Sequence, residues 1–133
     1  MHRILYLVIL LLPFETFCQQ DSTFICRLTL TEKYQNIESW TEETGKIIGA
    51  HANYLDSLGK AGKLILAGRT YFEPGDERLF GIILFNARST KEVNKHRDRD
   101  PAYIHKIQQW EIYPFSLGIN YLENGLKNNK KKK

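Results

Sequence analysis

The chain has 133 residues, of which 42% are hydrophobic and 26% are charged, and its formal net charge is +4. This length fits one domain of modest size with a single core. Five lysines lie in the tail formed by residues 124–133, so the rest of the chain is close to neutral. Without a basic stripe inside the domain, the composition argues against specific nucleic-acid binding.

The N-terminus has the pattern of a secretory signal peptide over residues 1–18. A short basic start precedes an apolar run at residues 4–12, and Thr16 and Cys18 are small residues at the positions that a signal peptidase recognises. The apolar run is too short for a membrane span. We therefore expect export to the periplasm or the exterior, with no integral membrane segment after cleavage. Lipidation of Cys18 is less favoured, because Phe17 stands where that processing needs a very small side chain.

After cleavage, residues 19–123 would form the folded domain and residues 124–133 a disordered Lys/Asn-rich tail. Cys26 is then the only cysteine left, so no internal disulfide can form. Its place in an apolar strand predicts a buried thiol that behaves as a small hydrophobe.

Hydrophobic periodicity and punctuation by Gly and Pro predict four strands and two main helices. Ser39 with Glu42, and Ser89 with Glu92, have the spacing of capping boxes at the starts of the two helices. In chain order we expect a strand at 24–30, a helix to about Lys60, a strand at 63–71, a hairpin turn at 72–77, a strand at 78–86, a helix to about Arg97, a helical turn at 102–105 and a strand at 110–115.

This order is βαββαβ, which predicts a ferredoxin-like α+β sandwich: a four-stranded antiparallel sheet with two helices on one face. The other face of the sheet would be left without helices. Its aromatic and branched side chains are too apolar to remain in water, so we expect a second subunit to cover it and form a homodimer.

His51 is the main candidate for chemistry. At helical spacing, Ile47, His51, Tyr54 and Leu58 share one side of the helix, which directs the imidazole toward the interior. A buried imidazole needs a hydrogen-bonding partner, and Asp100 is the candidate. Two interpretations remain open: His51 is a core histidine whose hydrogen bonds are satisfied, or it forms an acid–base site with Asp100.

Several of these features together resemble the YCII-related (YciI-like) domain family over roughly residues 24–115. They are His51, Tyr54, Leu55 and Leu58 in the helix, Gly62 in the turn, the strand Leu64-Ile65-Leu66-Ala67-Gly68, and Asp100-Pro101 after the second helix. The resemblance implies a fold of the dimeric α/β-barrel type. It also implies that His51 and Asp100 form an acid–base pair, as proposed for the family, which includes a dehydrochlorinase of aromatic degradation.

The predicted site would act on a small organic acid. Asp100 would orient the imidazole so that His51 can remove or deliver a proton. Arg69 could hold a substrate carboxylate or enolate, and Tyr54 or Tyr71 could donate a hydrogen bond to a carbonyl. These residues also have structural interpretations. Asp100 before Pro101 could be a helix N-cap, and Arg69 could pair with Glu73 or Glu111 at the surface.

No cofactor or metal is expected. The chain has no P-loop, no Gly-x-Gly-x-x-Gly and no paired His or Cys spacing, and His96 and His105 are predicted to be solvated. The leading hypothesis is thus a cofactor-independent lyase or isomerase. The alternative is a non-catalytic dimeric domain that binds a small ligand or serves as an accessory module.

Overall fold

The computed structural model describes residues 22–116, 118 and 119, so the predicted signal peptide and the lysine tail lie outside the described residues. Within this part of the chain, no helix is long and apolar enough to cross a membrane. The elements are β1 (Ser22–Leu30), the 3₁₀ helices η1 (Glu32–Gln35) and η2 (Ile37–Ser39), α1 (Glu42–Lys60), β2 (Leu64–Arg69), β3 (Gly81–Ala87), α2 (Thr90–Arg97), α3 (Pro101–Ile104) and β4 (Gln108–Phe115).

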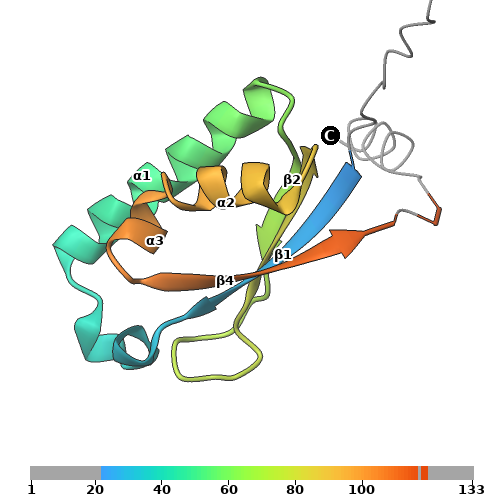
Figure 1. Cartoon of the computed structure of the whole chain (residues 1–133). Coiled ribbons are helices and arrows are strands. Elements are labelled where there is room, and N and C mark those ends of the chain that lie inside the picture. Colours follow the sequence, from blue (N-terminus) through green and yellow to red (C-terminus); the bar gives the residue numbers. More distant parts are fainter. Residues whose placement is uncertain (1–21, 117, 120–133) are drawn as a thin grey trace, which may run out of the picture.

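The four strands form one antiparallel sheet in the order β2-β3-β1-β4 (Figure 1). The three α-helices lie on one face of this sheet. This is the predicted ferredoxin-like α+β sandwich, with the short helix α3 added between α2 and β4. The two central strands, β1 and β3, come from different halves of the chain, so the sheet joins both βαβ halves into one unit.

The core lies between the sheet and the helices. Phe24, Cys26 and Leu28 alternate along β1 with less buried residues, and they pack in one cluster with Leu58 of α1 and Val93 of α2. Because successive side chains of a strand point to opposite faces, this alternation places one row of β1 against the helices. Cys26 is a free, fully buried thiol, as the sequence predicted.

Helix α1 begins two residues later than predicted. Thr41, not Ser39, is its N-cap: the Thr41 hydroxyl accepts a hydrogen bond from the backbone N–H of Thr44 (3.3 Å). Ser39 instead ends η2, and its carbonyl accepts a hydrogen bond from the Thr44 hydroxyl (3.1 Å). The prediction was wrong because the short 3₁₀ helix could not be distinguished from the first turn of α1. The predicted cap of α2 is confirmed, since the Ser89 side chain accepts from the N–H of Glu92.

The predicted hairpin between the second and third strands is present, because β2 and β3 pair antiparallel up to Arg69 and Gly81, but its connection is longer than predicted. Residues 70–80 form a longer loop, in which the expected turn at Pro74-Gly75 is present, with Gly75 at a φ of 93°. The loop is attached to η1, because the N–H of Gly75 donates to Gln35 Oε1 (3.2 Å). This tertiary contact holds the loop against η1, while the pairing of the two strands continues to the hydrogen bond from Thr70 N–H to the Phe80 carbonyl (3.0 Å).

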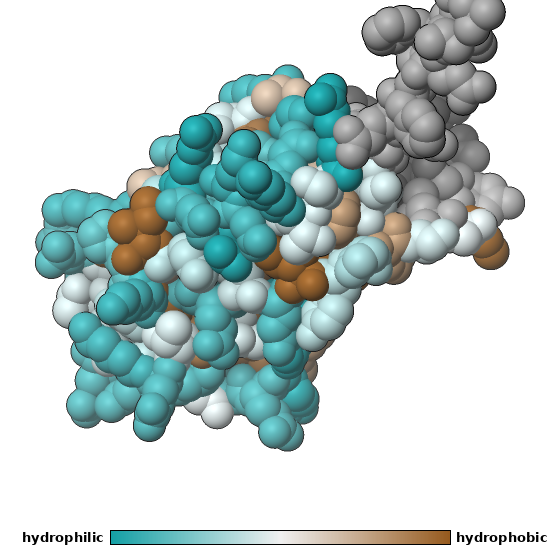
Figure 2. All heavy atoms as spheres, viewed as in Figure 1, coloured by the Kyte–Doolittle hydropathy of each residue, from teal (hydrophilic) through white to brown (hydrophobic). Residues whose placement is uncertain are grey.

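The two sides of the molecule differ in polarity. Figure 2 shows that the face carrying the helices presents mostly hydrophilic side chains, with small apolar patches between them. Side chains of the helix-free face include Ile25 and its cross-strand neighbour Tyr113, which is 53% exposed, and Ile82, which pairs with Arg27 on the same face. The sheet therefore leaves an apolar surface on the side opposite the helices.

Candidate active site between helix α1 and the sheet

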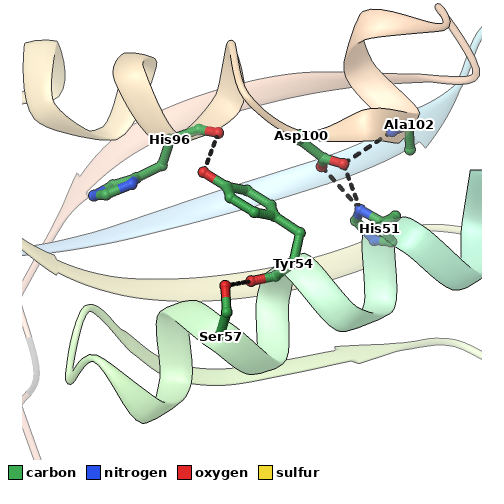
Figure 3. A network of polar contacts seen from close by, with 6 residues as sticks. All are labelled: His51, Tyr54, Ser57, His96, Asp100 and Ala102. Carbon is green, nitrogen blue, oxygen red and sulfur yellow. Dashed lines mark hydrogen bonds and ion pairs between the residues drawn. The ribbon is translucent and has the colours of Figure 1, made fainter.

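His51 and Asp100, 49 residues apart in the chain, meet in the folded domain. Nδ1 of His51 lies 2.8 Å from Oδ1 and 2.9 Å from Oδ2 of Asp100 (Figure 3). The His51 side chain is 12% exposed and the Asp100 side chain is completely buried. The pairing of His51 with Asp100, which the sequence left open, is therefore present. The buried carboxylate lies on the inner side of the imidazole, so the imidazole stands between the carboxylate and solvent.

Asp100 has two structural partners. Its side chain caps α3 by accepting the N–H of Ala102 at Oδ1 (2.9 Å), so the N-cap interpretation and the acid–base interpretation both describe this residue. An ionised carboxylate can only accept hydrogen bonds, which requires His51 to carry a proton on Nδ1. Nε2, on the opposite side of the ring, has no hydrogen-bonding partner among the described residues and is the atom available for chemistry.

A cavity of about 940 Å³ opens between α1 and the sheet, and His51 lies on its wall. Most of its lining is apolar, with polar side chains at a few positions. This combination is typical of sites that bind small molecules. The apolar residues include Leu28, Leu30, Trp40, Ile48, Leu55 and Ile83.

Arg69 also lines this cavity, at the end of the edge strand β2. It forms no ion pair with any described residue, and Glu111, one of its candidate surface partners, pairs with Arg27 instead (3.1 Å). Gly81, the cross-strand neighbour of Arg69, lines the cavity as well. Since glycine adds no side chain there, the floor beside Arg69 stays open. The guanidinium is therefore free to bind an anionic group of a ligand.

The two tyrosines predicted at the site do not line the cavity. Tyr54 donates a hydrogen bond from its hydroxyl to the carbonyl oxygen of His96 (2.9 Å), which ties α1 to α2 (Figure 3). Burial raises the pKa of the Tyr54 phenol, and the charge of Asp100 acts in the same direction, whereas Arg99 opposes it. Tyr71 is 94% exposed in the loop after β2. Neither hydroxyl is therefore placed to contact a ligand in the cavity.

His96 is not solvated, contrary to prediction. Its ring stacks on Phe85 at a centroid distance of 5.6 Å and an interplanar angle of 2°, and its Nε2 is buried. Burial lowers the pKa of His96, while Glu92 raises it by a smaller amount. Burial also raises the pKa of the Cys26 thiol to about 12, so this residue is not a thiolate nucleophile at neutral pH.

No group of three or more His, Cys, Asp and Glu side chains within the described ranges is arranged to hold a metal ion. The groups that line the cavity are the His51 imidazole backed by the Asp100 carboxylate, the charged side chains of Arg69, Lys60, Asp56 and Glu73, and apolar walls.

Sequence analysis missed Gln108 and Trp40, which both line the cavity. Gln108 precedes the predicted last strand, which was expected to begin at Trp110. Had the alternation of Trp110 and Ile112 been extended two residues back, Gln108 would have been placed on the face toward the helices. No sequence signal pointed to Trp40, which enters the cavity through the 3₁₀ segment before α1.

The fold and the site together define the class of protein: a ferredoxin-like α+β domain with a His–Asp pair on the wall of a ligand-sized, mostly apolar cavity. The chain belongs to the YCII-related domain family, whose sequence profile matches residues 24–116. No curated protein sequence matches the chain significantly.

Two solved structures are similar in fold. The first is 5-chloro-2-hydroxyhydroquinone dehydrochlorinase (TftG) from Burkholderia phenoliruptrix AC1100, in complex with 2,5-dihydroxybenzoquinone. It has a TM-score of 0.55 and 17% identity, over 72% of this chain and 95% of that chain. The second is SnoaB, a cofactor-independent oxygenase from Streptomyces nogalater, with a TM-score of 0.40 and 9% identity over 77% of this chain and 98% of that one. At this level of identity the first likeness supports the fold, and the second carries no weight.

Proposed function

We propose that this protein is a cofactor-independent lyase or isomerase that uses His51 and Asp100 as an acid–base pair on a small organic acid. The observation that carries the proposal is the contact of both Asp100 oxygens with Nδ1 of His51, at the wall of a cavity that also holds Arg69. The structural neighbour is a dehydrochlorinase, and elimination of chloride belongs to this reaction class.

The proposed reaction begins with removal of a proton from a carbon of the substrate by Nε2 of His51. The electron pair of that C–H bond moves to a conjugated oxygen, and Arg69 stabilises the resulting enolate or phenolate. In an isomerase the His51 imidazolium returns the proton to another carbon. In a lyase the electron pair moves back and expels a leaving group, such as halide, from a neighbouring carbon. Asp100 stabilises the imidazolium throughout.

The direct test is proton exchange in D₂O, followed by proton NMR, with a panel of small organic acids that carry a lactone, an enone or a chlorinated hydroquinone. Chloride release is measured in parallel for the chlorinated compounds. We expect the wild-type domain to exchange or eliminate with at least one compound and His51→Gln to lose this activity. The Gln side chain can still donate to Asp100, so the variant should keep the fold, which circular dichroism checks.

Each other outcome has a definite meaning. Ligand binding without exchange in the wild type would assign the alternative function, a non-catalytic domain that binds small ligands. Equal exchange by the wild type and His51→Gln would contradict the proposed role of the imidazole. If no compound binds, the cavity is not a small-acid site.

We further propose that the domain forms a homodimer through the helix-free face of the sheet. This face carries apolar side chains, among them Ile25, Ile82 and the largely exposed Tyr113, and covering it removes that apolar area from water. Sedimentation of the wild type should give a dimer. Tyr113→Glu should give a monomer, because it would bury a charge in the interface. A monomeric wild type at micromolar concentration would refute this proposal.

Export is proposed on the signal-like pattern of residues 1–18. Mass spectrometry of the protein recovered from the producing cells tests this directly. A chain that begins after Cys18 supports export. A chain that begins at Cys18 with an attached lipid would favour membrane anchoring instead, and an intact N-terminus would refute cleavage.

A further inference from the structure

Gln108 brings an unpaired polar group to the cavity. Three buried side-chain atoms within the described part of the chain have no hydrogen-bond partner: Nε2 of His96, Nε1 of Trp110 and Oε1 of Gln108. Of these three residues, only Gln108 lines the cavity. The rings of His96 and Trp110 both pack on Phe85 in the core, and neither residue lines the cavity.

The strand register fixes where Gln108 stands. It pairs with Leu30 of β1, in the row of side chains that faces the helices, and its neighbour Gln109 points to the opposite face, where it donates to the Thr29 hydroxyl (3.1 Å). An amide oxygen on a buried face is stabilised only if a donor reaches it. No described residue supplies that donor, and Gln108 lines the cavity, so a ligand there supplies it once the amide turns its oxygen toward the cavity.

Gln108 and Arg69 stand at opposite sides of the cavity. The sheet order places Arg69 on the outer strand β2 and Gln108 on the outer strand β4. Neighbouring strands are about 4.8 Å apart, so the backbones of these two strands are separated by roughly 14 Å. His51 comes from α1, which closes the cavity from the side opposite the sheet. The cavity therefore has a cationic end, an acceptor end and a base from the helix.

We infer that Gln108 is a specificity-determining residue, and that the substrate class is a small unsaturated or aromatic ring acid with a hydroxyl group distant from its anionic group. This inference rests on the function proposed above. Arg69 binds the anionic group, and the Gln108 carbonyl accepts a hydrogen bond from the hydroxyl at the other end. A ligand that lacks the hydroxyl leaves the buried acceptor unpaired and binds more weakly.

The test uses benzoate, the three hydroxybenzoates and the matching methoxybenzoates as probes, with calorimetric titration of the full chain. In the wild type, 3- or 4-hydroxybenzoate should bind about tenfold more tightly than benzoate and than its methoxy counterpart. 2-Hydroxybenzoate should show no such gain, because its hydroxyl lies beside the carboxylate and faces the Arg69 end.

Two matched variants locate the effect. Gln108→Met, which keeps the length of the side chain without the amide, should remove the tenfold gain and leave benzoate affinity within about twofold. Gln109→Met, the same substitution on the opposite face, should retain the gain. The thermal midpoint of unliganded Gln108→Met should equal or exceed that of the wild type, because an unpaired buried acceptor is removed.

The outcomes separate this inference from the proposed function. The role of Gln108 is overturned if the tenfold gain in affinity survives in Gln108→Met, or if no hydroxybenzoate shows the gain. A uniform weakening of all benzoates in Arg69→Met would still support the proposed site for a small acid. A large fall in the thermal midpoint of Gln108→Met would show that the amide serves the fold and would also overturn the inference. If no benzoate binds the wild type, this inference fails, whereas the proposed function is decided separately by the proton-exchange test.

Discussion

Replacing Asp100 with asparagine isolates the electrostatic role of the carboxylate from its role as a helix cap. In Asp100→Asn the side chain would keep an oxygen to accept the N–H of Ala102, so α3 retains its N-cap. Toward His51, however, the new amide nitrogen can only donate. Oδ1, although 2.8 Å from Nδ1, is already held by the N–H of Ala102, so we expect Nδ1 to accept from the new amide, which moves the ring proton to Nε2 and removes the base from the cavity.

The expected cost in stability is small. A charge-assisted hydrogen bond contributes about 1.5–3 kcal/mol and a neutral one about 0.5–1.5 kcal/mol, so Asp100→Asn should cost about 1 kcal/mol, or ~4–8 °C in thermal midpoint. Asp100→Ala loses the cap as well and leaves Nδ1 of His51 unpaired, for a total of about 2–4 kcal/mol. Activity should fall ~10²–10⁴-fold in both variants, since in serine proteases the same tautomer change slows catalysis about 10⁴-fold.

Nitrogen-15 NMR of histidine-labelled protein measures the tautomer directly. The wild type should show a protonated Nδ1 and an unprotonated Nε2 at His51, and Asp100→Asn should show the reverse. His51→Gln assigns the signals by removing them. Asp98→Asn is the matched control, because Asp98 lies two residues away, is exposed and pairs with Arg97 without reaching His51. It should change neither the tautomer nor the activity.

An unchanged tautomer in Asp100→Asn would refute the reasoning, since it would mean that groups other than the carboxylate orient the ring. Full activity with a reversed tautomer would be equally damaging, because the proposed base would then carry a proton at the reacting atom.

Three further predictions concern other parts of the domain. Burial lowers the pKa of His96, so the unfolded state binds the proton more readily than the folded state. The urea midpoint should therefore fall as the pH drops below the ordinary histidine pKa of about 6.5. His96→Gln should make the urea midpoint less dependent on pH, and an equal pH dependence in both proteins would contradict this prediction. Gly81→Val should fold but should weaken benzoate binding at least tenfold in calorimetry. The reason is that a Cβ at this position lies 3.4 Å from the Cβ of Leu28, on the cavity floor. An unchanged affinity would mean that the ligand binds elsewhere. Cys26, with its pKa raised to about 12 by burial, should react with a thiol reagent only after denaturant is added, and labelling of the native protein would show that the core opens.

Parts of this molecule follow from local sequence. The alternation along residues 24–30 fixed which side chains of the first strand face the core, since a strand has only two faces. The Ser89–Glu92 spacing located the start of α2, because a cap forms between residues three apart. The same local logic placed His51 on the buried side of its helix. In each case the relevant contacts are made within a few residues of chain.

Tertiary structure decided everything that depends on how these pieces dock. An apolar stripe on a helix is about 100° wide, so helical spacing could not tell that His51 faces the cavity and Asp100 while Tyr54, one turn away, reaches α2. Gln108 and Arg69 line the same cavity only because β2 and β4 are the two outer strands of the one sheet that lines it. Local pattern tells which way a side chain points, but its neighbour is set by long-range packing of elements that are far apart in the chain.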